Sequence, residues 1–217
     1  SLQIGRGLQR SVELDPLRRG QQFDGPHSRR VLGHVEQAAR AAGRQLWMYP
    51  STVHSSLGGF LSGGSGGTGT IAHGSNDRGF VVALDVVTPA SAGELVHLEG
   101  EAAQGFVHNY GTAGIIARAT VRLEPLQDWR GLYASFPDFS GALSVLRSLG
   151  RLTPLPRLVS ADTPHVTAQL PPDDAFPEGR SSLRMIADIA TVPEATALIE
   201  AAGGRIEDVR EGANVSS

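Results

Sequence analysis

Glycine dominates the segment Gly58–Gly74, in which eight of the seventeen residues are glycine. A backbone without side chains reaches positive φ and can present its N–H groups directly to a ligand. Successive N–H groups in one concavity would bind phosphate or pyrophosphate. Phe60, Leu61 and Ile71 favour a packed setting over a flexible Gly/Ser linker. The segment therefore predicts an anion cradle that is ordered against the apolar segment Phe80–Val87 and lines a large cleft.

Two other chemistries match the same segment. Gly63–Gly67 satisfies the G-x-S-x-G pattern, which would make Ser65 the nucleophile of a hydrolase. That pattern needs a strand before the serine and a helix after it, and Thr68–Thr70 is poor helix material. Gly64–Gly69 matches the dinucleotide fingerprint, with Asp85 at a plausible distance for a ribose contact. No clear strand leads into that fingerprint, so both alternatives are less favoured than the cradle.

His73 stands at the end of the glycine segment, near Asn76 and Asp77. It could face a ligand, but a hydrogen bond that anchors the loop is the favoured interpretation. The histidines show no metal-ligand spacing, so no metal site is predicted. The seven histidines are His27, His34, His54, His73, His97, His108 and His165.

We expect the acidic pair Asp173 and Asp174 to lie in a solvated loop.

Composition excludes several classes of function. The 217 residues carry a formal net charge of −3 with a pI near 6.1, which argues against nucleic acid as a partner. No cysteine is present, which excludes a disulfide framework and a thiolate nucleophile. All nineteen basic residues are arginine, which excludes a phosphate-binding or Schiff-base lysine. No apolar run is long enough to span a membrane, and a cytoplasmic protein is expected.

Periodicity predicts the elements that would position the glycine segment. Alternating polarity makes the strand Ile115–Leu123 the clearest of them. The other expected elements are a helix over 31–42 capped by Ser28 and ended by Gly43, strands at Gln45–Tyr49, Phe80–Val87 and Glu94–Leu98, and a helix at Ala102–Tyr110 closed by Gly111.

The pattern breaks at Leu126–Arg130, where we expect a domain boundary between residues 127 and 128. Strand–helix pairs follow, and they predict an α+β layer with helices on one face of a mainly antiparallel sheet. The expected elements are a strand at Leu132–Phe136, a helix capped by Asp138 that buries Phe139, Leu143 and Leu146, a strand at Arg157–Ser160, a helix opened by Thr163 and Pro164, a loop at Pro171–Gly179, a strand at Ser182–Ala190, a helix with a capping box of Thr191 and Glu194 that ends at Gly203, and a strand at Arg205–Val209.

Two motifs, one after the other along the chain, resemble those of a known protein family. The first runs from Pro50–Thr52 through Leu57–Gly67 and His73-Gly74 to the strand Phe80–Val87. The second is Tyr110–Ile116, followed by the alternating strand. Together they resemble the FAD-binding domain of the vanillyl-alcohol-oxidase type, also called the p-cresol-methylhydroxylase (PCMH) type. The resemblance is greatest to FAD-linked oxidases related to glycolate oxidase and D-lactate dehydrogenase flavoproteins.

The resemblance implies FAD as the cofactor and assigns residues to it. Residues 50–52 would lie along the flavin and its pyrophosphate, the glycine segment would give backbone contacts, and the second motif would line the adenine end. The implied cofactor-binding residues are Pro50, Ser51, Thr52, Gly58, Gly59, Ser62, Gly63, Ser65, Gly66, Gly74, Gly114, Ile115 and Ile116. No catalytic residue is assigned.

The resemblance also implies an architecture and an activity. Residues 1–127 would form the FAD-binding domain, mainly its second subdomain, and 128–217 an α+β cap-like domain, both expected to be incomplete. The implied activity is oxidation of a small 2-hydroxy acid or alcohol by hydride transfer to flavin. The alternative is a non-catalytic FAD-binding or assembly subunit. A small-molecule substrate and a homo-oligomer or partner subunit are the expected partners.

Overall fold

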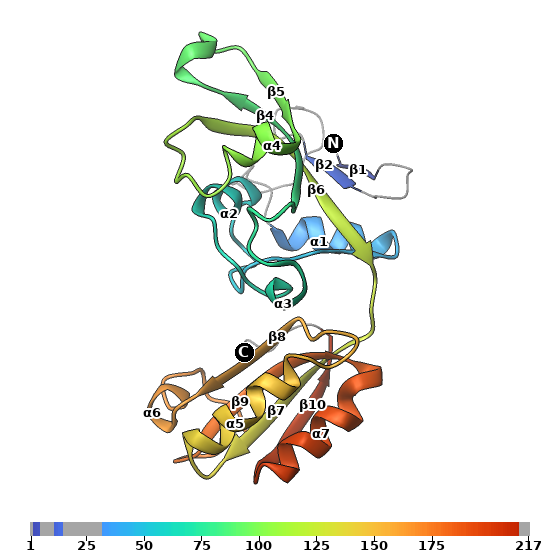
Figure 1. Cartoon of the computed structure of the whole chain (residues 1–217), viewed down its shortest axis with the longest axis vertical. Helices are drawn as coiled ribbons and strands as arrows, with labels where there is room; N and C mark the ends of the chain where they lie inside the picture. Colours follow the sequence, from blue (N-terminus) through green and yellow to red (C-terminus); the bar gives the residue numbers. More distant parts are fainter. Residues whose placement is uncertain (1, 5–10, 15–31, 213–217) are drawn as a thin grey trace. The chain divides into compact units, whose positions relative to one another are not determined.

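The computed structural model describes residues 2–4, 11–14 and 32–212. The chain divides into two compact units, unit 1 (Ser1–Leu126) and unit 2 (Gln127–Ser217), drawn with their elements in Figure 1. The identity of these units as FAD-binding and cap-like domains stays a prediction. The expected helix cap Ser28 lies outside the described residues.

Unit 1 is built on an antiparallel sheet. Within the described residues its strands follow the order β1-β2-β6-β4-β5, and β3 pairs with the end of β6. Helices connect these strands. The elements are β1 (Leu2–Ile4), β2 (Ser11–Leu14), α1 (Leu32–Ala41), β3 (Arg44–Leu46), α2 (Leu57–Gly63), α3 (Thr70–His73), β4 (Val81–Val87), the 3-10 turn η1 (Pro89–Ser91), β5 (Val96–Glu99), α4 (Gly100–Gln104) and β6 (Ile115–Pro125).

One face of this sheet holds the core of unit 1. Leu84 and Val86 of β4 and Val121 of β6 are almost fully buried against apolar residues of α1 and α2. Phe60 of α2 packs edge-to-face on Phe80, with ring centroids 6.3 Å apart. This contact ties the glycine segment to the start of β4, so the segment is ordered against that strand.

Three predictions for unit 1 need correction. The glycine segment is not one loop, because α2 and α3 occupy much of it. The predicted helix Ala102–Tyr110 ends at Gln104, because the residues after it turn back toward α2. The predicted strand Gln45–Tyr49 is shorter, because Tyr49 leaves the sheet to form an isolated bridge with Thr68.

Unit 2 has the βαββαβ order of a ferredoxin-like fold. Its antiparallel sheet follows the order β10-β7-β9-β8. The elements are β7 (Trp129–Phe136), α5 (Phe139–Leu149), β8 (Leu158–Asp162), α6 (Pro164–Thr167), β9 (Ser181–Asp188), the 3-10 turn η2 (Ile189–Thr191), α7 (Val192–Ala201) and β10 (Arg205–Glu211).

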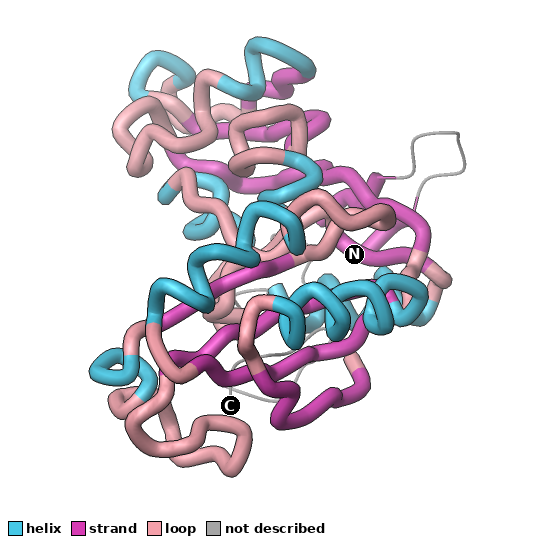
Figure 2. Tube along the Cα trace, turned by 60° about the horizontal axis from the view of Figure 1, so that its bottom comes forward, coloured by secondary structure: helices cyan, strands magenta, loops and turns pink. Residues whose placement is uncertain are grey.

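The helices α5 and α7 lie on one face of this sheet, as predicted and as Figure 2 shows. Asp138 caps α5 by accepting the Gly141 N–H at 2.9 Å, which confirms that prediction. The predicted burial of Leu143 is wrong. Its side chain is 49% exposed, because Ala142, Val145 and Leu149 form the buried stripe of the helix.

The predicted capping box at Thr191 is also wrong. The Thr191 hydroxyl donates to the Asp188 carbonyl oxygen at 2.9 Å and caps no helix N–H. The Asp188 carboxylate instead accepts the Ala190 N–H at 2.9 Å. The cap therefore belongs to the short turn η2, which links β9 to α7.

The second face of this sheet carries arginines stacked on aromatic rings. The Arg210 guanidinium lies 4.4 Å from the centre of the buried Tyr133 ring and binds both oxygens of Asp173, at 2.6 and 2.7 Å. This ion pair joins the loop Pro171–Gly179 to β10 and holds the pKa of Asp173 at about 2. The prediction that Asp173 is merely solvated is wrong, whereas Asp174 is exposed.

Replacing Asp173 by asparagine should release this loop, because the bidentate ion pair to Arg210 is lost. Limited proteolysis should then cleave the loop Pro171–Gly179 several-fold faster. Asp174→Asn is the matched control, since the Asp174 side chain makes no hydrogen bond or ion pair with the described residues. Equal cleavage of both variants and the parent chain would contradict a clasp at Asp173.

The same ion pair has a defined pH dependence. The pKa of Asp173 in the folded chain lies below its ordinary value of 3.8. The stability that the ionised Asp173 carboxylate contributes to the fold is therefore fully present above pH 3.8 and is lost as the pH falls through about 2.

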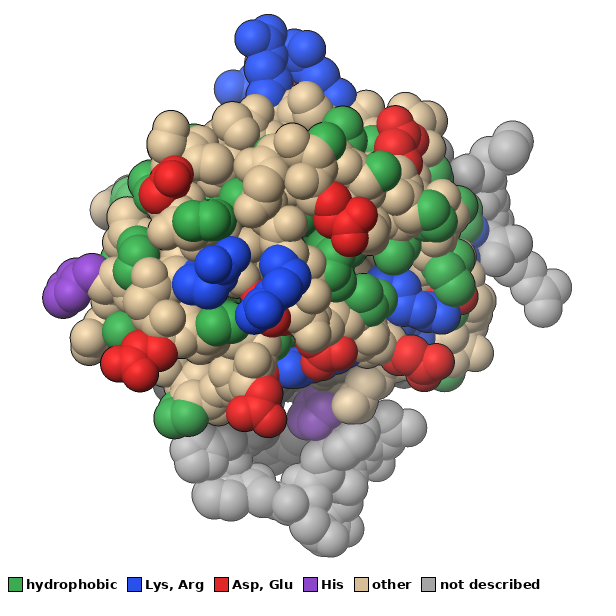
Figure 3. Space-filling view, turned by 90° about the horizontal axis from the view of Figure 1, so that it is seen from below, with side chains coloured by type: hydrophobic (Ala, Val, Ile, Leu, Met, Phe, Trp, Pro, Cys, Tyr) green, Lys and Arg blue, Asp and Glu red, His purple; other side chains and the backbone are tan. Residues whose placement is uncertain are grey.

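The charge distribution on the surface and the length of the helices agree with what the composition predicts. On the face in Figure 3, acidic and basic side chains are interspersed rather than gathered by sign. Among the described residues, no helix is long and apolar enough to cross a membrane.

Candidate functional site

The site is built around helix α2, which forms although three of its seven residues are glycine. Ser56 caps its first turn, because the Ser56 hydroxyl accepts the Gly59 N–H at 3.1 Å. Leu57, Phe60 and Leu61 recur at helical spacing and are buried. Gly64 then ends the helix in the left-handed conformation with φ +63°.

Many N–H groups of the glycine segment already donate hydrogen bonds to nearby atoms of the chain. Gly59 donates to Ser56, Gly64 donates to the Phe60 carbonyl oxygen, and Gly67 donates to the Thr70 hydroxyl. The N–H groups of Ser65 and Gly66 donate to no atom of the described part of the chain. The anion cradle predicted for the whole segment is therefore reduced to the turn that follows α2.

The loop that leads into the second motif lies directly against the end of α2 and its cap Gly64. The His108 N–H donates to the Leu61 carbonyl oxygen at 2.9 Å, and the Tyr110 N–H donates to the Ser62 carbonyl oxygen at 2.8 Å. The His108 ring also packs on Gly64, where a Cβ would lie 1.8 Å from it. The structure thus brings together two motifs that are more than forty residues apart in the sequence.

The glycines have two different surroundings. A Cβ on Gly67 or Gly69 would lie 2.2 or 2.0 Å from a backbone carbonyl oxygen of residues 47–49, so these glycines permit close packing of the chain. A Cβ on Gly114 would lie 2.6 Å from the Val87 carbonyl oxygen. A Cβ on Gly63 would have no described atom within 4 Å outside the backbone of its own helix, so this position is open to a ligand.

The other residues implied for the cofactor have defined places. Pro50 adjoins the bridge between Tyr49 and Thr68, while Ser51 and Thr52 are exposed. A Cβ on Gly58 would lie 4.0 Å from the Ile116 carbonyl oxygen, so the start of α2 meets the start of β6. Ile115 is 72% exposed.

Gly74 is further from the turn along the chain. It ends α3 with φ +74°, next to Arg78. The contacts above join residues 58–64 to residues 108–116 but do not include Gly74.

His108 and Tyr110 were missed as site residues. Both have positive φ, 59° and 56°, which is uncommon for residues other than glycine, and Tyr110 is 76% exposed. Their rings meet edge-to-face at 5.7 Å. Only the motif Tyr110–Ile116 signalled this loop in the sequence, and it gave no indication of the strained backbone.

The alternative chemistries lack their structural context. Helix α2, not a strand, precedes Ser65, so the hydrolase arrangement is absent. Asp85, the residue that would contact the ribose in the dinucleotide fingerprint, accepts hydrogen bonds from His97 and Arg118 instead. His73 stacks on Trp47 and makes a 2.8 Å hydrogen bond with Glu124, as expected for a loop anchor.

Two cavities of the described residues lie away from this turn. Among the described residues, no group of three His, Cys, Asp or Glu side chains could hold a metal ion. One cavity of about 280 Å³ lies on the sheet of unit 1, and another of about 240 Å³ lies beside the loop Pro171–Gly179. Neither cavity contains a residue of Gly58–Gly74, so the prediction that the segment lines a large cleft gains no support from them.

Comparison with known proteins yields structural similarity alone. No protein-family model and no curated protein sequence matches the chain. Two solved structures of alkyldihydroxyacetonephosphate synthase, in crystal forms P1 and P212121, are similar to it. The first has a TM-score of 0.72 at 15% identity and covers 97% of this chain and 42% of that chain. The second has a TM-score of 0.68 at 16% identity and covers 92% of this chain and 39% of that chain.

The chain therefore spans less than half the length of these structures. At such low identity the similarity establishes the fold and not the activity. This α+β chain, with its two antiparallel sheets, has the fold of part of alkyldihydroxyacetonephosphate synthase.

Proposed function

We propose that this chain is the FAD-binding portion of a flavin-dependent oxidoreductase that acts on a small 2-hydroxy acid or alcohol. One observation carries the proposal: the end of α2, with its cap Gly64, lies against residues 108–110. The first of these belongs to the glycine-rich motif, and the second leads into the motif Tyr110–Ile116. The order of these two motifs resembles the PCMH-type FAD-binding domain. The structural similarity to part of alkyldihydroxyacetonephosphate synthase supports the same family of folds.

The residues of the turn fit a diphosphate. Ser65 and Gly66 offer two adjacent N–H donors that the described chain does not use. Gly63, two residues before Ser65, has open space at its Cβ position among the described residues. Asn76 is fully buried and donates to the Phe60 carbonyl oxygen at 2.6 Å, which fixes the end of α2. FAD bound there would supply the electron acceptor for hydride transfer.

The rest of the site would hold the cofactor in place. The rings of His108 and Tyr110 lie next to the turn and offer an aromatic surface beside the N–H donors. Gly114 precedes β6, and Ile116, near the start of β6, lies against Gly58 at the start of α2. In this arrangement the chain binds and orients the flavin, and no described side chain is assigned as a catalytic base.

The proposal is tested by adding FAD, FMN and NAD separately to the purified full chain. Binding is followed by quenching of flavin fluorescence and, for NAD, by calorimetry. We expect FAD to bind more tightly than FMN, which lacks the second phosphate, and more tightly than NAD, which has the diphosphate but no isoalloxazine ring. Absence of FAD binding would overturn the proposal.

Anaerobic addition of small 2-hydroxy acids to the FAD-loaded chain then tests the activity. Loss of the flavin colour would support the oxidoreductase. A stable colour with every substrate would favour the alternative of a non-catalytic FAD-binding or assembly subunit.

A further inference from the structure

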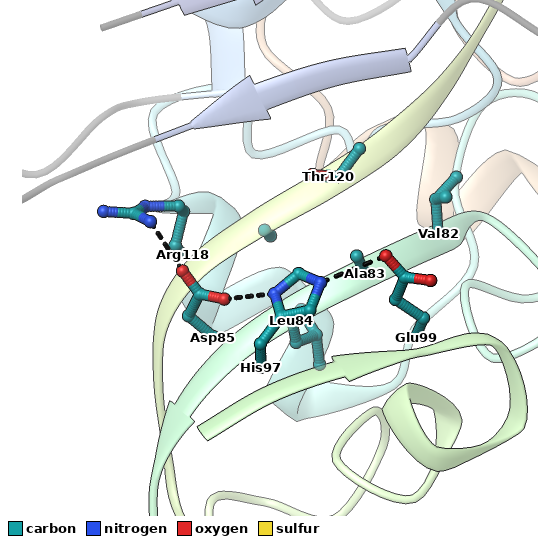
Figure 4. Close-up of a pocket in the computed structure, with 9 residues that line it drawn as sticks. Val82, Ala83, Leu84, Asp85, His97, Glu99, Arg118 and Thr120 are labelled. Atoms are coloured by element: carbon teal, nitrogen blue, oxygen red, sulfur yellow. Dashed lines mark hydrogen bonds and ion pairs between the residues drawn. The ribbon is translucent and has the colours of Figure 1, made fainter. Parts of the chain in front are cut away.

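A histidine on the outer face of the unit 1 sheet is held between two carboxylates. His97 lies on β5, opposite Asp85 of β4, and its side chain enters the cavity of about 280 Å³ drawn in Figure 4. His97 Nδ1 is 2.6 Å from Asp85 Oδ1, and His97 Nε2 is 3.1 Å from Glu99 Oε1. Arg118 of β6 donates to the other oxygen of Asp85 at 2.7 Å.

The chemistry of these contacts determines the protonation of His97. An ionised carboxylate only accepts hydrogen bonds, so each ring nitrogen must carry a proton for both contacts to be hydrogen bonds. Only the imidazolium meets that requirement. Among the described side chains of this cavity the charged groups are Asp85, His97, Glu99 and Arg118, so their charges balance when His97 is protonated. Both carboxylates raise the pKa of His97, Asp85 the more strongly.

Few apolar side chains hold β5 in place. Among the described strands it is the last on its side of the sheet, and its register with β4 has four residue pairs. Of its four residues, Leu98 is half-buried and the others are exposed. Apolar burial by β5 itself therefore contributes little, and the His97 contacts add to the backbone pairing with β4 and to the packing of α4, which follows β5 directly.

We propose that His97 is a pH-sensitive clasp of the β4–β5 hairpin. The protonated ring fastens β5 to β4. The neutral ring leaves one nitrogen lone pair facing a carboxylate, and the edge strand loosens. Because Asp85 also binds Arg118, deprotonation leaves β4 joined to β6, and the response is confined to β5 and the turn before it. This inference does not depend on FAD binding.

The sign of the pH dependence follows from the raised pKa. The folded-state pKa of His97 lies above the ordinary value of 6.5. The stabilisation is therefore complete below 6.5 and is lost as the pH rises through the folded-state pKa. His97 and Glu99 are 61% and 74% exposed, so solvent weakens the pair and the effect is local rather than global.

The test is amide hydrogen exchange of residues 96–99 at about pH 5.5 and about pH 8, corrected for intrinsic exchange. We expect protection to fall several-fold at the higher pH, and the His97 ring signals to titrate above 6.5. Glu99→Gln is the decisive variant. Its amide can donate to neutral Nε2 while Nδ1–H still binds Asp85, so β5 should stay protected at both pH values.

Two further variants complete the test. His97→Gln should remove the pH dependence of protection, whereas the exposed His54→Gln should leave it unchanged. The proposal is overturned if His97 titrates at or below 6.5, or if the pH dependence is the same in Glu99→Gln as in the parent chain.

Discussion

Gly69→Ala should destabilise unit 1 by roughly 3–4 kcal/mol. Gly69 has φ +97°, and a Cβ there would lie 2.0 Å from the Trp47 carbonyl oxygen. The left-handed backbone costs an alanine about 1.5 kcal/mol, and forcing a methyl group into packed backbone costs about 2 kcal/mol more. Urea unfolding followed by tryptophan fluorescence measures this loss through Trp47, which lies in unit 1.

Gly93→Ala is the matched control for this variant. Gly93 has a similar φ of +88°, but no atom lies within 4 Å of its Cβ position. This variant should be destabilised only by the cost of placing an alanine in the left-handed backbone conformation, about 1.5 kcal/mol. Equal destabilisation by the two variants would show that the close approach of Gly69 to residue 47 is not important for stability.

Gly63→Val should lower the affinity for FAD at least about tenfold, or about 1.4 kcal/mol. Gly63 is the last residue of α2, and its Cβ position is open. A valine therefore fits the fold, and we expect its side chain to occupy space that FAD would need next to the turn at Ser65 and Gly66. A fluorescence titration with FAD gives the affinity, and circular dichroism verifies the fold.

Gly150→Val provides the comparison for this effect. Gly150 follows helix α5 in unit 2 with φ −67°, and a Cβ there makes only ordinary contact with the Leu146 carbonyl oxygen, at 3.4 Å. It should bind FAD as the parent chain does. Unchanged affinity in Gly63→Val would remove the turn after α2 from the site.

The sequence predicted the regular elements whose pattern is local. The strand Ile115–Leu123 alternates in polarity, and Asp138 precedes an apolar helix, so both could be found without tertiary information. Helix α2 was also detectable from Ser56, Leu57, Phe60 and Leu61. The high glycine content concealed it, because glycine suggests a loop even where capping and buried side chains stabilise a helix.

The site was predicted only in part, because its contacts are long-range. The resemblance named both motifs, but the hydrogen bonds from His108 and Tyr110 to α2 span more than forty residues. The roles of Gly67 and Gly69 in chain packing depend on the position of residues 47–49. Gly114, which the resemblance assigned to the cofactor, likewise lies against the Val87 carbonyl oxygen, so the fold itself requires that glycine.

Charged contacts were the least predictable. Asp173 and Arg210 are thirty-seven residues apart and meet through the fold of unit 2. Asp85 and His97 face each other only in one register of β4 and β5, and a shift by one residue would separate them. Neither pair has a sequence motif.

The most direct test of the proposed flavin site is a titration of the isotope-labelled full chain with FAD, followed by amide NMR. The amide signals of Ser65 and Gly66 should shift most, together with those of Gly63 and Tyr110, while the signals of α5 and α7 stay in place. If FAD binds without moving Ser65 and Gly66, or does not bind, the account of this turn as the diphosphate site is contradicted.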